Sequence, residues 1–234
     1  MSVLALATSV AFAAPSEFVK NGGFDYNAGN GQIGFNTTAD DWSVAAGGYT
    51  FLFTSAAAAM AGTTNGSEGP LALYGPGNGV ANGFTGSSQG GAFIAQDSAY
   101  KQMAITQSIS GLTPGNNYVL TFEWAGAQQT GYLGQTWDEW QVSFGSQLFT
   151  TEKKDVPSQG FNAWKTETHT FTALNETEIL SFFANGGPSG LPPFALLDNV
   201  SLQAEAVPEP GVIVGMLTGF AAFARRRRAA KARG

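Results

Sequence analysis

Few side chains of this protein are suited to catalysis. His169 is the only histidine and there are no cysteines, so the sequence excludes a histidine metal cluster and a thiolate site. The acidic pairs Asp40–Asp41 and Asp138–Glu139 are adjacent in sequence. Neighbouring residues of a strand point to opposite faces, so neither pair forms a two-carboxylate glycosidase centre by itself. We therefore predict a protein that is not an enzyme, with glycoside hydrolysis as the least favoured alternative.

Aromatic and amide side chains favour binding over catalysis. Exposed aromatic rings stack on sugar faces, while Asn, Gln and Asp side chains bond the hydroxyl groups. Trp124 and Trp140 share the parity of apolar neighbours and should be buried, whereas Trp137 has the opposite parity and follows a polar loop. The alternative is that the loop aromatics only cap the fold. The predicted ligand patch comprises Gln128, Gln129, Tyr132, Trp137 and Asp138.

One carboxylate stands out because it lies in an apolar strand. Asp198 shares its parity with the apolar residues of segment 196–202, which predicts that it faces the core. Burying a bare carboxylate is expensive, so a buried aspartate must be hydrogen-bonded, paired with a cation or bound to a metal. Asp198 is therefore expected to be structurally important.

The elements that must position these side chains are strands. Charged residues make up only 12% of the chain and there are 31 glycines, a composition typical of short strands joined by many turns. Apolar and polar residues alternate along several segments, as in strands with one buried face. We predict an all-β fold, an antiparallel jelly-roll β-sandwich that covers residues 16–204 as one domain. The predicted strands include 103–109, 118–124, 140–144, 166–172, 180–184 and 196–202.

Charge is distributed unevenly along the chain. Residues 14–207 carry 16 acidic and 5 basic residues, a formal charge of -11, whereas the whole chain carries -6. Such an acidic body argues against nucleic-acid binding, because phosphate contacts need clustered Lys and Arg. Six of the 11 basic residues lie in the last ten positions, after an apolar run, which favours a place beside a membrane.

The N-terminus has the features of a truncated signal peptide. The stretch 3–12 is apolar, and Ala11-Phe12-Ala13 fits the small-x-small pattern that precedes a signal-peptidase cut. The basic residues that normally precede the apolar stretch are missing. We predict that residues 1–13 are cleaved during export across the inner membrane. The alternative is a buried N-terminal strand or helix.

The C-terminus has three consecutive parts. Val207, Pro208, Glu209 and Pro210 are followed by the apolar run 211–224 and then by Arg225, Arg226, Arg227 and Arg228. The two prolines leave an extended segment that a processing enzyme can reach. A stable transmembrane helix needs about 20 residues, so the short apolar helix predicted here is either a transient stop or a permanent anchor. The arginines would remain cytoplasmic, with the body outside.

This order of motif, apolar run and basic cluster resembles the PEP-CTERM sorting signal of Gram-negative bacteria. The resemblance covers residues 207–228 and implies that 207–234 is a sorting and anchor segment. It further implies an exosortase, a membrane-embedded enzyme that processes the protein near Pro-Glu-Pro, as a partner. A location at the cell surface or in the extracellular matrix, linked to exopolysaccharide or biofilm, is implied as well. An ordinary tail anchor is the alternative.

Three short motifs stand at the start, middle and end of the predicted domain. They are Asn21-Gly22-Gly23-Phe24-Asp25, Leu112-Thr113-Pro114-Gly115 and Leu197-Asp198-Asn199-Val200-Ser201-Leu202. They resemble galactose-binding-like domains, which include several carbohydrate-binding modules. The resemblance implies a structural calcium for which Asp25 and Asp198 match the acidic positions, with no other cofactor. Calcium takes six to eight oxygens, so backbone carbonyls would supply the rest. The alternative is that both carboxylates bond backbone amides.

Two functions remain open from the sequence. The first is a non-enzymatic, exported surface protein that is sorted through its C-terminal tail. The alternative is a carbohydrate-binding module with a defined glycan ligand. An exposed Trp/Tyr platform would favour glycan binding, whereas buried rings would favour a scaffold. An enzyme would need two carboxylates that converge in one cleft.

Overall fold

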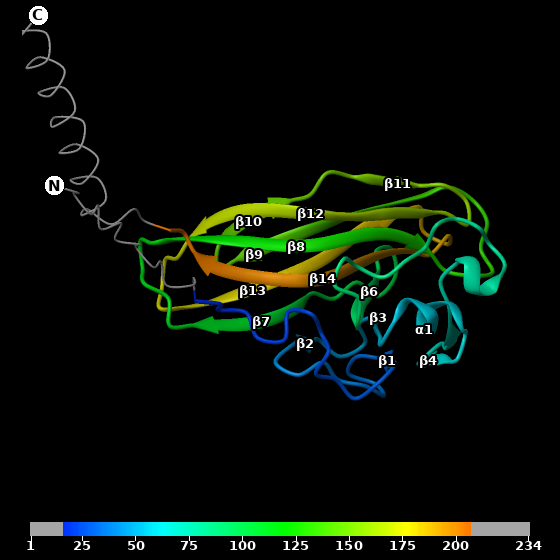
Figure 1. Cartoon of the computed structure of the whole chain (residues 1–234), viewed down its shortest axis with the longest axis horizontal. Coiled ribbons are helices and arrows are strands. Elements are labelled where there is room, and N and C mark those ends of the chain that lie inside the picture. The colour runs from blue at the N-terminus through cyan, green and yellow to red at the C-terminus, as the bar shows by residue number, and fades with distance from the viewer. Residues whose placement is uncertain (1–15, 207–234) are drawn as a thin grey trace, which may run out of the picture. The chain divides into compact units, whose positions relative to one another are not determined.

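Two antiparallel sheets pack face to face in this protein. The computed structural model describes residues 16–206 (Figure 1). The first sheet has the strand order β1-β3-β6-β14-β8-β12, and the second has the order β10-β9-β13-β7-β2 with β11 paired to β9. All strand pairs within them are antiparallel. The predicted antiparallel jelly-roll β-sandwich is confirmed.

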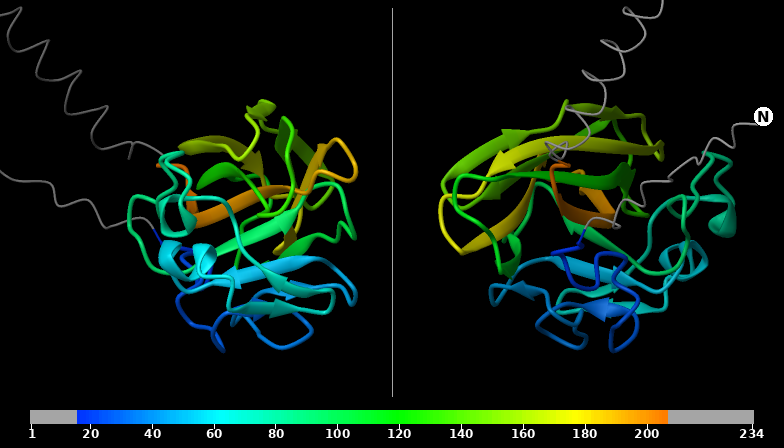
Figure 2. Two further views of the ribbon diagram at one scale, coloured as in Figure 1. Left: turned by 90° about the vertical axis from the view of Figure 1, so that its right-hand side faces the viewer. Right: turned by 60° about the vertical axis from the view of Figure 1, so that its left-hand side comes forward.

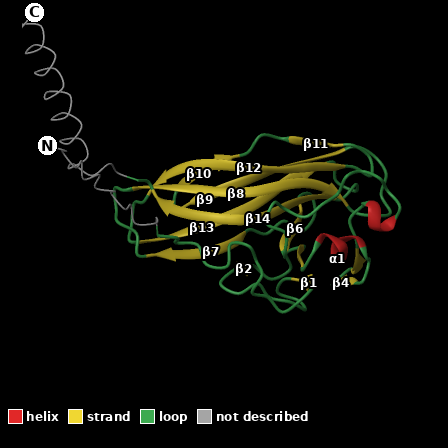
Figure 3. Cartoon of the chain, viewed as in Figure 1, coloured by secondary structure: helices red, strands yellow, loops and turns green. Residues whose placement is uncertain are grey.

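The two sheets differ in the length of their strands. The first sheet contains β1 (Gly31–Gln32), β3 (Thr50–Phe53), β6 (Phe93–Asp97), β8 (Asn117–Gln128), β12 (Phe161–Thr172) and β14 (Pro193–Ala204). The second contains β2 (Ser43–Val44), β7 (Ile105–Ser110), β9 (Thr136–Phe144), β10 (Gln147–Thr150), β11 (Lys154–Val156) and β13 (Thr177–Gly187). Between β3 and β6 the chain makes an excursion of α1 (Ala56–Met60), β4 (Thr64–Gly66), β5 (Gly69–Leu71) and the 3-10 turn η1 (Pro76–Asn78). Both helical segments drawn in Figure 3 belong to this excursion.

The main core lies between the two sheets and follows the alternation read from the sequence. On β8 the buried residues Leu120, Phe122 and Trp124 alternate with partly exposed ones. Trp140 on β9 is also fully buried, and its ring lies 6.1 Å from that of Phe182 on β13. The prediction that Trp124 and Trp140 are core residues is confirmed.

A second core covers the opposite face of the first sheet. Phe51, Phe93 and Phe194 are fully buried there beneath the excursion. Figure 2 shows the excursion, drawn in cyan, beside β3 and β6. At this end the first sheet is therefore buried on both faces, which simple alternation did not indicate.

A β-bulge in β14 changes the face on which Asp198 lies. The pairing of β14 with β8 shifts register between Asp198 and Ser201, and Asn199 has a positive φ of 52°. A bulge inserts one residue and so reverses the alternation beyond it. Val200 therefore joins the core between the sheets, whereas Asp198 points to the opposite face. The prediction that Asp198 shares the face of Val200 was wrong for this reason.

Both predicted terminal segments fall outside the described residues. These are the signal segment 1–13 and the sorting segment 207–234, with its apolar helix and arginine cluster. Within residues 16–206, no helix is long and apolar enough to cross a membrane.

Candidate functional site

A pocket of about 350 Å³ opens where loops from both sheets meet the β4–β5 hairpin. Its lining residues Gln129 and Tyr132 follow the C-terminal end of β8, and this end of the strand is on the right in Figure 1. Three loops contribute to it: the one after β6, the one after β8 and the one between β13 and β14. The lining residues are Tyr49, Glu68, Pro70, Asp97, Tyr100, Gln129, Tyr132, Ser189, Gly190 and Pro192.

Three tyrosines give the pocket its aromatic surface. Tyr100 and Tyr132 expose 46% and 38% of their surface, respectively, so both rings are accessible to a ligand. Tyr49 is buried and packs edge-on against Tyr100, with the ring centres 5.8 Å apart. Burial, assisted by the charges of Asp97 and Glu68, raises the pKa of Tyr49 to about 12. Its hydroxyl therefore stays protonated at neutral pH.

Two carboxylates line the same pocket, and both already have hydrogen-bond partners. Asp97 Oδ1 accepts bonds from the backbone N–H groups of Ala99 (2.9 Å) and Tyr100 (3.0 Å), which closes the turn that carries Tyr100. Burial raises the pKa of Asp97 to about 7 despite these two bonds. Glu68 accepts a bond from the Lys101 ammonium, which holds the pKa of Glu68 below its usual value.

The chemistry of this lining favours hydroxyl-rich, uncharged ligands. The lining residues include no Lys or Arg, so an anionic ligand would find no basic partner among them, and the charge of Glu68 is already balanced by Lys101. Carboxylate, amide and hydroxyl oxygens accept bonds from ligand hydroxyl groups. Exposed tyrosine rings offer apolar faces beside these polar groups.

The structure divides the ligand patch predicted from the sequence. Gln129 and Tyr132 line the pocket. Gln128 and Asp138 are fully buried, so neither belongs to an exposed ligand surface. The Gln128 side chain instead braces the neighbouring loops, accepting from the Gln159 N–H at 2.7 Å and donating to the Gly134 carbonyl at 3.1 Å.

Trp137 does not line the pocket. Its position alternates with buried neighbours on β9, so it faces away from the core, as its parity predicted. A Cβ on the cross-strand residue Gly187 would lie 3.1 Å from the indole Nε1, which shows how closely the ring covers this glycine. The Lys153 ammonium lies 4.6 Å from the ring centre. Of the five predicted patch residues, two therefore meet in one pocket.

Asp138 lies in a closed part of the core behind the pocket. Its Oδ1 accepts a bond from the Ser98 hydroxyl, and its Oδ2 is buried without a hydrogen-bond partner. Burial raises the pKa of Asp138 well above its usual value, and the charge of the nearby Asp97 adds to this effect. Burial of this kind favours the neutral form of a carboxyl.

A second pocket, of about 340 Å³, contains Asp25 and lies beside Asp198. Asp198 is fully buried and accepts bonds from the Ser87 hydroxyl and the Asn199 N–H. Burial raises the pKa of Asp198 to about 7, and the charges of Asp25 and Glu123 raise it further.

Asp25 and Asp198 face the same small space. A Cβ on Gly23 would lie 3.6 Å from Asp25 Oδ2 and 3.9 Å from Asp198 Oδ1. Among residues 16–206 there is no group of three or more His, Cys, Asp and Glu side chains that could hold a metal. These two carboxylates supply the hard oxygen donors that calcium prefers, and backbone carbonyls would have to complete its coordination. Asp25 Oδ1 accepts from the Ala92 N–H (2.9 Å) and Asp198 Oδ1 from the Asn199 N–H (2.7 Å), so both carboxylates bond backbone amides, as the alternative predicted. The residues present therefore fit a calcium ion only in part.

No serine triad forms among the described residues. Ser88 lies in the loop segment Gly86–Gly90, whose spacing matches Gly-x-Ser-x-Gly, a match that the sequence reasoning missed. Its hydroxyl donates to Glu123 rather than to a histidine. The ring of His169 stacks on Phe149 with the ring centres 4.4 Å apart. The motif match lacks the strand–turn–helix setting of a nucleophile elbow.

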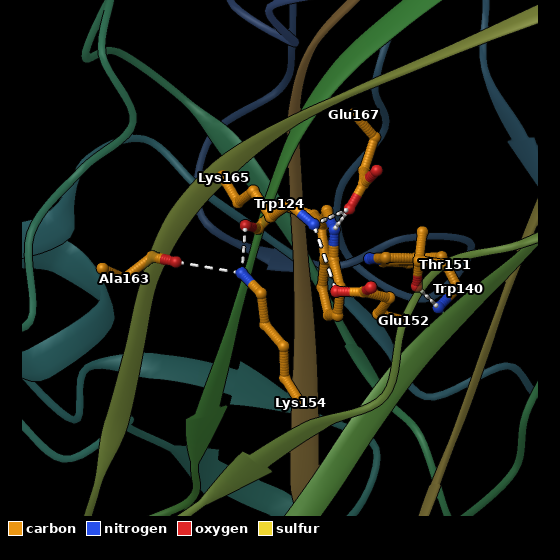
Figure 4. A network of polar contacts seen from close by, with 8 residues as sticks. All are labelled: Trp124, Trp140, Thr151, Glu152, Lys154, Ala163, Lys165 and Glu167. Atoms are coloured by element: carbon orange, nitrogen blue, oxygen red, sulfur yellow. Dashed lines mark hydrogen bonds and ion pairs between the residues drawn. The ribbon is translucent and has the colours of Figure 1, made fainter.

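A network of polar contacts links β12 of the first sheet to β11 of the second sheet (Figure 4). The Lys154 ammonium donates to the carbonyls of Trp124 (3.1 Å) and Ala163 (3.0 Å), beside the register shift between Asn162 and Lys165. It also lies 4.1 Å from the centre of the Trp124 ring. Burial lowers the pKa of Lys154 to about 8. These bonds satisfy carbonyls at an irregular point of the ladder, so the role of Lys154 is structural.

Comparisons with known proteins found similar solved structures but no family. No family model matches the sequence, and no curated protein matches it. Among solved structures, TmCBM61 in complex with β-1,4-galactotriose is 14% identical over 81% of this chain and 99% of that chain, with a TM-score of 0.44. The CBM22-1 xylan-binding domain of Paenibacillus barcinonensis Xyn10C is 10% identical over 85% and 100% of the two chains, with a TM-score of 0.40. Identities and scores this low do not assign the chain to a family.

Proposed function

We propose that this protein binds a neutral glycan in the pocket lined by Tyr100, Tyr132 and Asp97. The observation that supports this proposal is the convergence of exposed aromatic rings and hydrogen-bond acceptors in one concave site. The lining contains no Lys or Arg, which disfavours uronic acids and sulfated or phosphorylated sugars because their charges would have no basic partner there. The ligand class is therefore an uncharged oligosaccharide.

Titration calorimetry with a panel of neutral and acidic oligosaccharides tests this proposal. Tyr132→Ala should lower the affinity for the bound glycan at least about 3-fold, because a stacking ring is lost. Leu133→Ala is the matched control, since Leu133 is adjacent, 65% exposed and absent from the pocket lining. Failure of every neutral glycan to bind, or equal affinity of Tyr132→Ala and wild type, would overturn the proposal.

We assign binding rather than hydrolysis to this pocket. It does bring two carboxylates into one cleft, which is the arrangement that an enzyme would need. However, Asp97 closes a turn and Glu68 is held by Lys101, so each group already has a structural partner. Release of reducing ends from a neutral polysaccharide by wild type, and its loss in Asp97→Asn, would instead establish a glycosidase.

Export and sorting form a second proposal, supported by the three-part tail of the sequence. The protein is exported, and an exosortase-type enzyme processes it near Pro208-Glu209-Pro210, leaving the acidic body at the cell surface or in the matrix. Mass spectrometry of the mature protein should show a C-terminus close to this motif. An intact C-terminus that includes Arg225 to Arg228 would contradict processing, and an intact Met1 would contradict signal cleavage.

Calcium at Asp25 and Asp198 is a third proposal. Its support is the placement of both carboxylates around Gly23, together with the raised pKa of Asp198. A bound divalent cation would neutralise two charges that otherwise repel one another. Its role would be to hold the segment around Asp25 against β14.

A further inference from the structure

Strand β12 forms an unpaired edge of the first sheet. Among the described strands it pairs only with β8, so every second peptide group points away from the sheet. The hydrogen bonds of Thr172 show which peptide groups point outward. Its N–H (3.2 Å) and its carbonyl (2.6 Å) both bond the side-chain amide of Gln147, away from β8. The alternation places the peptide groups of Thr166, Thr168 and Thr170 on the same outward side.

Two side chains mark the ends of the open stretch. At one end Lys154 covers the carbonyl of Ala163 (Figure 4). At the other end Gln147 covers Thr172 with the pair of bonds that a neighbouring strand would make. Between them, Thr166, Thr168 and Thr170 are exposed, and within residues 16–206 their outward peptide groups have no hydrogen-bond partner. A further strand could therefore be added along residues 166–170.

We propose that the β12 edges of two copies of this chain pair antiparallel about a two-fold axis at Thr168. Thr168 then opposes the partner's Thr168, and Thr166 opposes the partner's Thr170. Each of the three pairs exchanges two backbone hydrogen bonds. Cross-strand threonine pairs are favourable, so the hydrogen-bonded positions are self-complementary.

The charged residues of β12 select this register. With the axis at Thr168, Glu167 lies opposite the partner's His169, so no like charges face each other across the pair. Within its own chain the Glu167 carboxylate accepts from Trp124 Nε1 (3.2 Å) and pairs with Lys165 Nζ (3.0 Å). Moving the axis to Glu167 would place two glutamates directly opposite each other, which is unfavourable. Moving it to His169 would place Thr166 opposite the partner's Thr172, whose peptide Gln147 already covers, so that only the two pairs between Thr168 and Thr170 could form. A strand pair of five residues is a small interface, so the dimer is weak and forms only at high concentration.

Disulfide trapping in the full chain tests the register, since the natural sequence has no cysteine. Directly opposed, hydrogen-bonded residues have Cα atoms about 5.5 Å apart, which suits a disulfide. Thr168→Cys should give covalent dimers under mild oxidation. Thr121→Cys is the matched control because Thr121 pairs with Thr168 inside the chain, one strand from the edge. Thr166→Cys should also stay monomeric, because it opposes Thr170 and not itself. Equal dimer yields from the three variants would overturn the proposal.

Sedimentation at protein concentrations up to about 1 mM tests the same edge without a cross-link. Thr168→Pro removes an outward N–H and leaves the bonds to β8 in place. We expect wild type and Thr168→Val to dimerise and Thr168→Pro to remain monomeric. A monomeric wild type, or an equally dimeric Thr168→Pro, would contradict the proposal. If Thr168→Pro does not fold, the disulfide result decides.

Discussion

Asp138 and Asp198 are both fully buried on long strands, yet their surroundings differ. Asp138 has one donor, the Ser98 hydroxyl, and its second oxygen has no hydrogen-bond partner among the described residues. Asp198 lies next to a surface pocket, faces a second carboxylate and bonds both Ser87 and Asn199. The closed site can relieve a buried charge only by protonation. The site of Asp198 can also do so by binding a cation, because a pocket that contains Asp25 lies beside it.

The largest expected effect is on the free energy of unfolding when Asp138 is replaced. Two substitutions distinguish the loss of side-chain volume from the loss of charge. Asp138→Ala should lower the free energy of unfolding by about 2–3 kcal/mol, because it leaves a void and removes the acceptor of the Ser98 hydroxyl. Asp138→Asn should lie within about 1 kcal/mol of wild type, since an amide resembles a protonated carboxyl. Urea unfolding at pH 7 measures both. Equal losses for the two variants would show that Asp138 is charged and stabilising.

We expect calcium to stabilise the protein through the site of Asp198 and not through the site of Asp138. At a calcium concentration 100 times its dissociation constant, the stabilisation is about 2.7 kcal/mol, or roughly 5–10 °C in Tm for a domain of this size. Asp198→Asn should lose this response, whereas Asp138→Asn should keep it. Thermal melts in calcium and in chelator provide the measurement. Identical wild-type melts in both buffers would remove the calcium proposal.

The two sites should also differ in how pH affects stability. The folded pKa of each group lies above its unfolded value, so the folded state binds more protons and stability falls as pH rises from about 4 towards the folded pKa. For Asp198 this window ends at about pH 7. Each group contributes a slope of at most about 1.4 kcal/mol per pH unit. In chelator, Asp198→Asn should reduce the slope measured by denaturant unfolding between pH 5 and 7. Calcium should reduce it in wild type, and an unchanged slope in both tests would contradict the assignment.

The smallest expected effect comes from a methyl group placed between the two open-site carboxylates. Gly23→Ala brings its Cβ only into ordinary contact, so stability in chelator should change by less than about 0.5 kcal/mol. The same methyl should weaken the calcium response of the melt. The corresponding substitution beside Asp138 is Gly126→Ala. Its Cβ would lie 2.7 Å from Val156 Cγ2 and 3.2 Å from Asp138 Oδ2. A normal calcium response in Gly23→Ala would show that the ion does not lie between Asp25 and Asp198.

Local alternation predicted much of the sandwich but little of the candidate site. The strands around Trp124, Trp140 and Phe171 were correct because each alternates around one buried face, which is a property of adjacent residues. The pocket brings together Tyr49, Asp97 and Gln129 from separate segments. No spacing rule connects positions that only the loops bring together, so sequence reasoning found Gln129 and Tyr132 but missed the other lining residues.

The sequence by itself determined the class of the fold, its acidic body and the burial of Trp124 and Trp140. These follow from composition and from the two-residue period of a strand, which need no knowledge of distant contacts. Only the tertiary structure decided the side of the sheet on which Asp198 lies, because the bulge after it reverses the alternation. It likewise placed Asp138 in a closed core and Asp25 beside Asp198. Whether a buried carboxylate lies in a closed core or beside a pocket depends on which segments pack over it. Contacts between residues far apart in the sequence determine that packing.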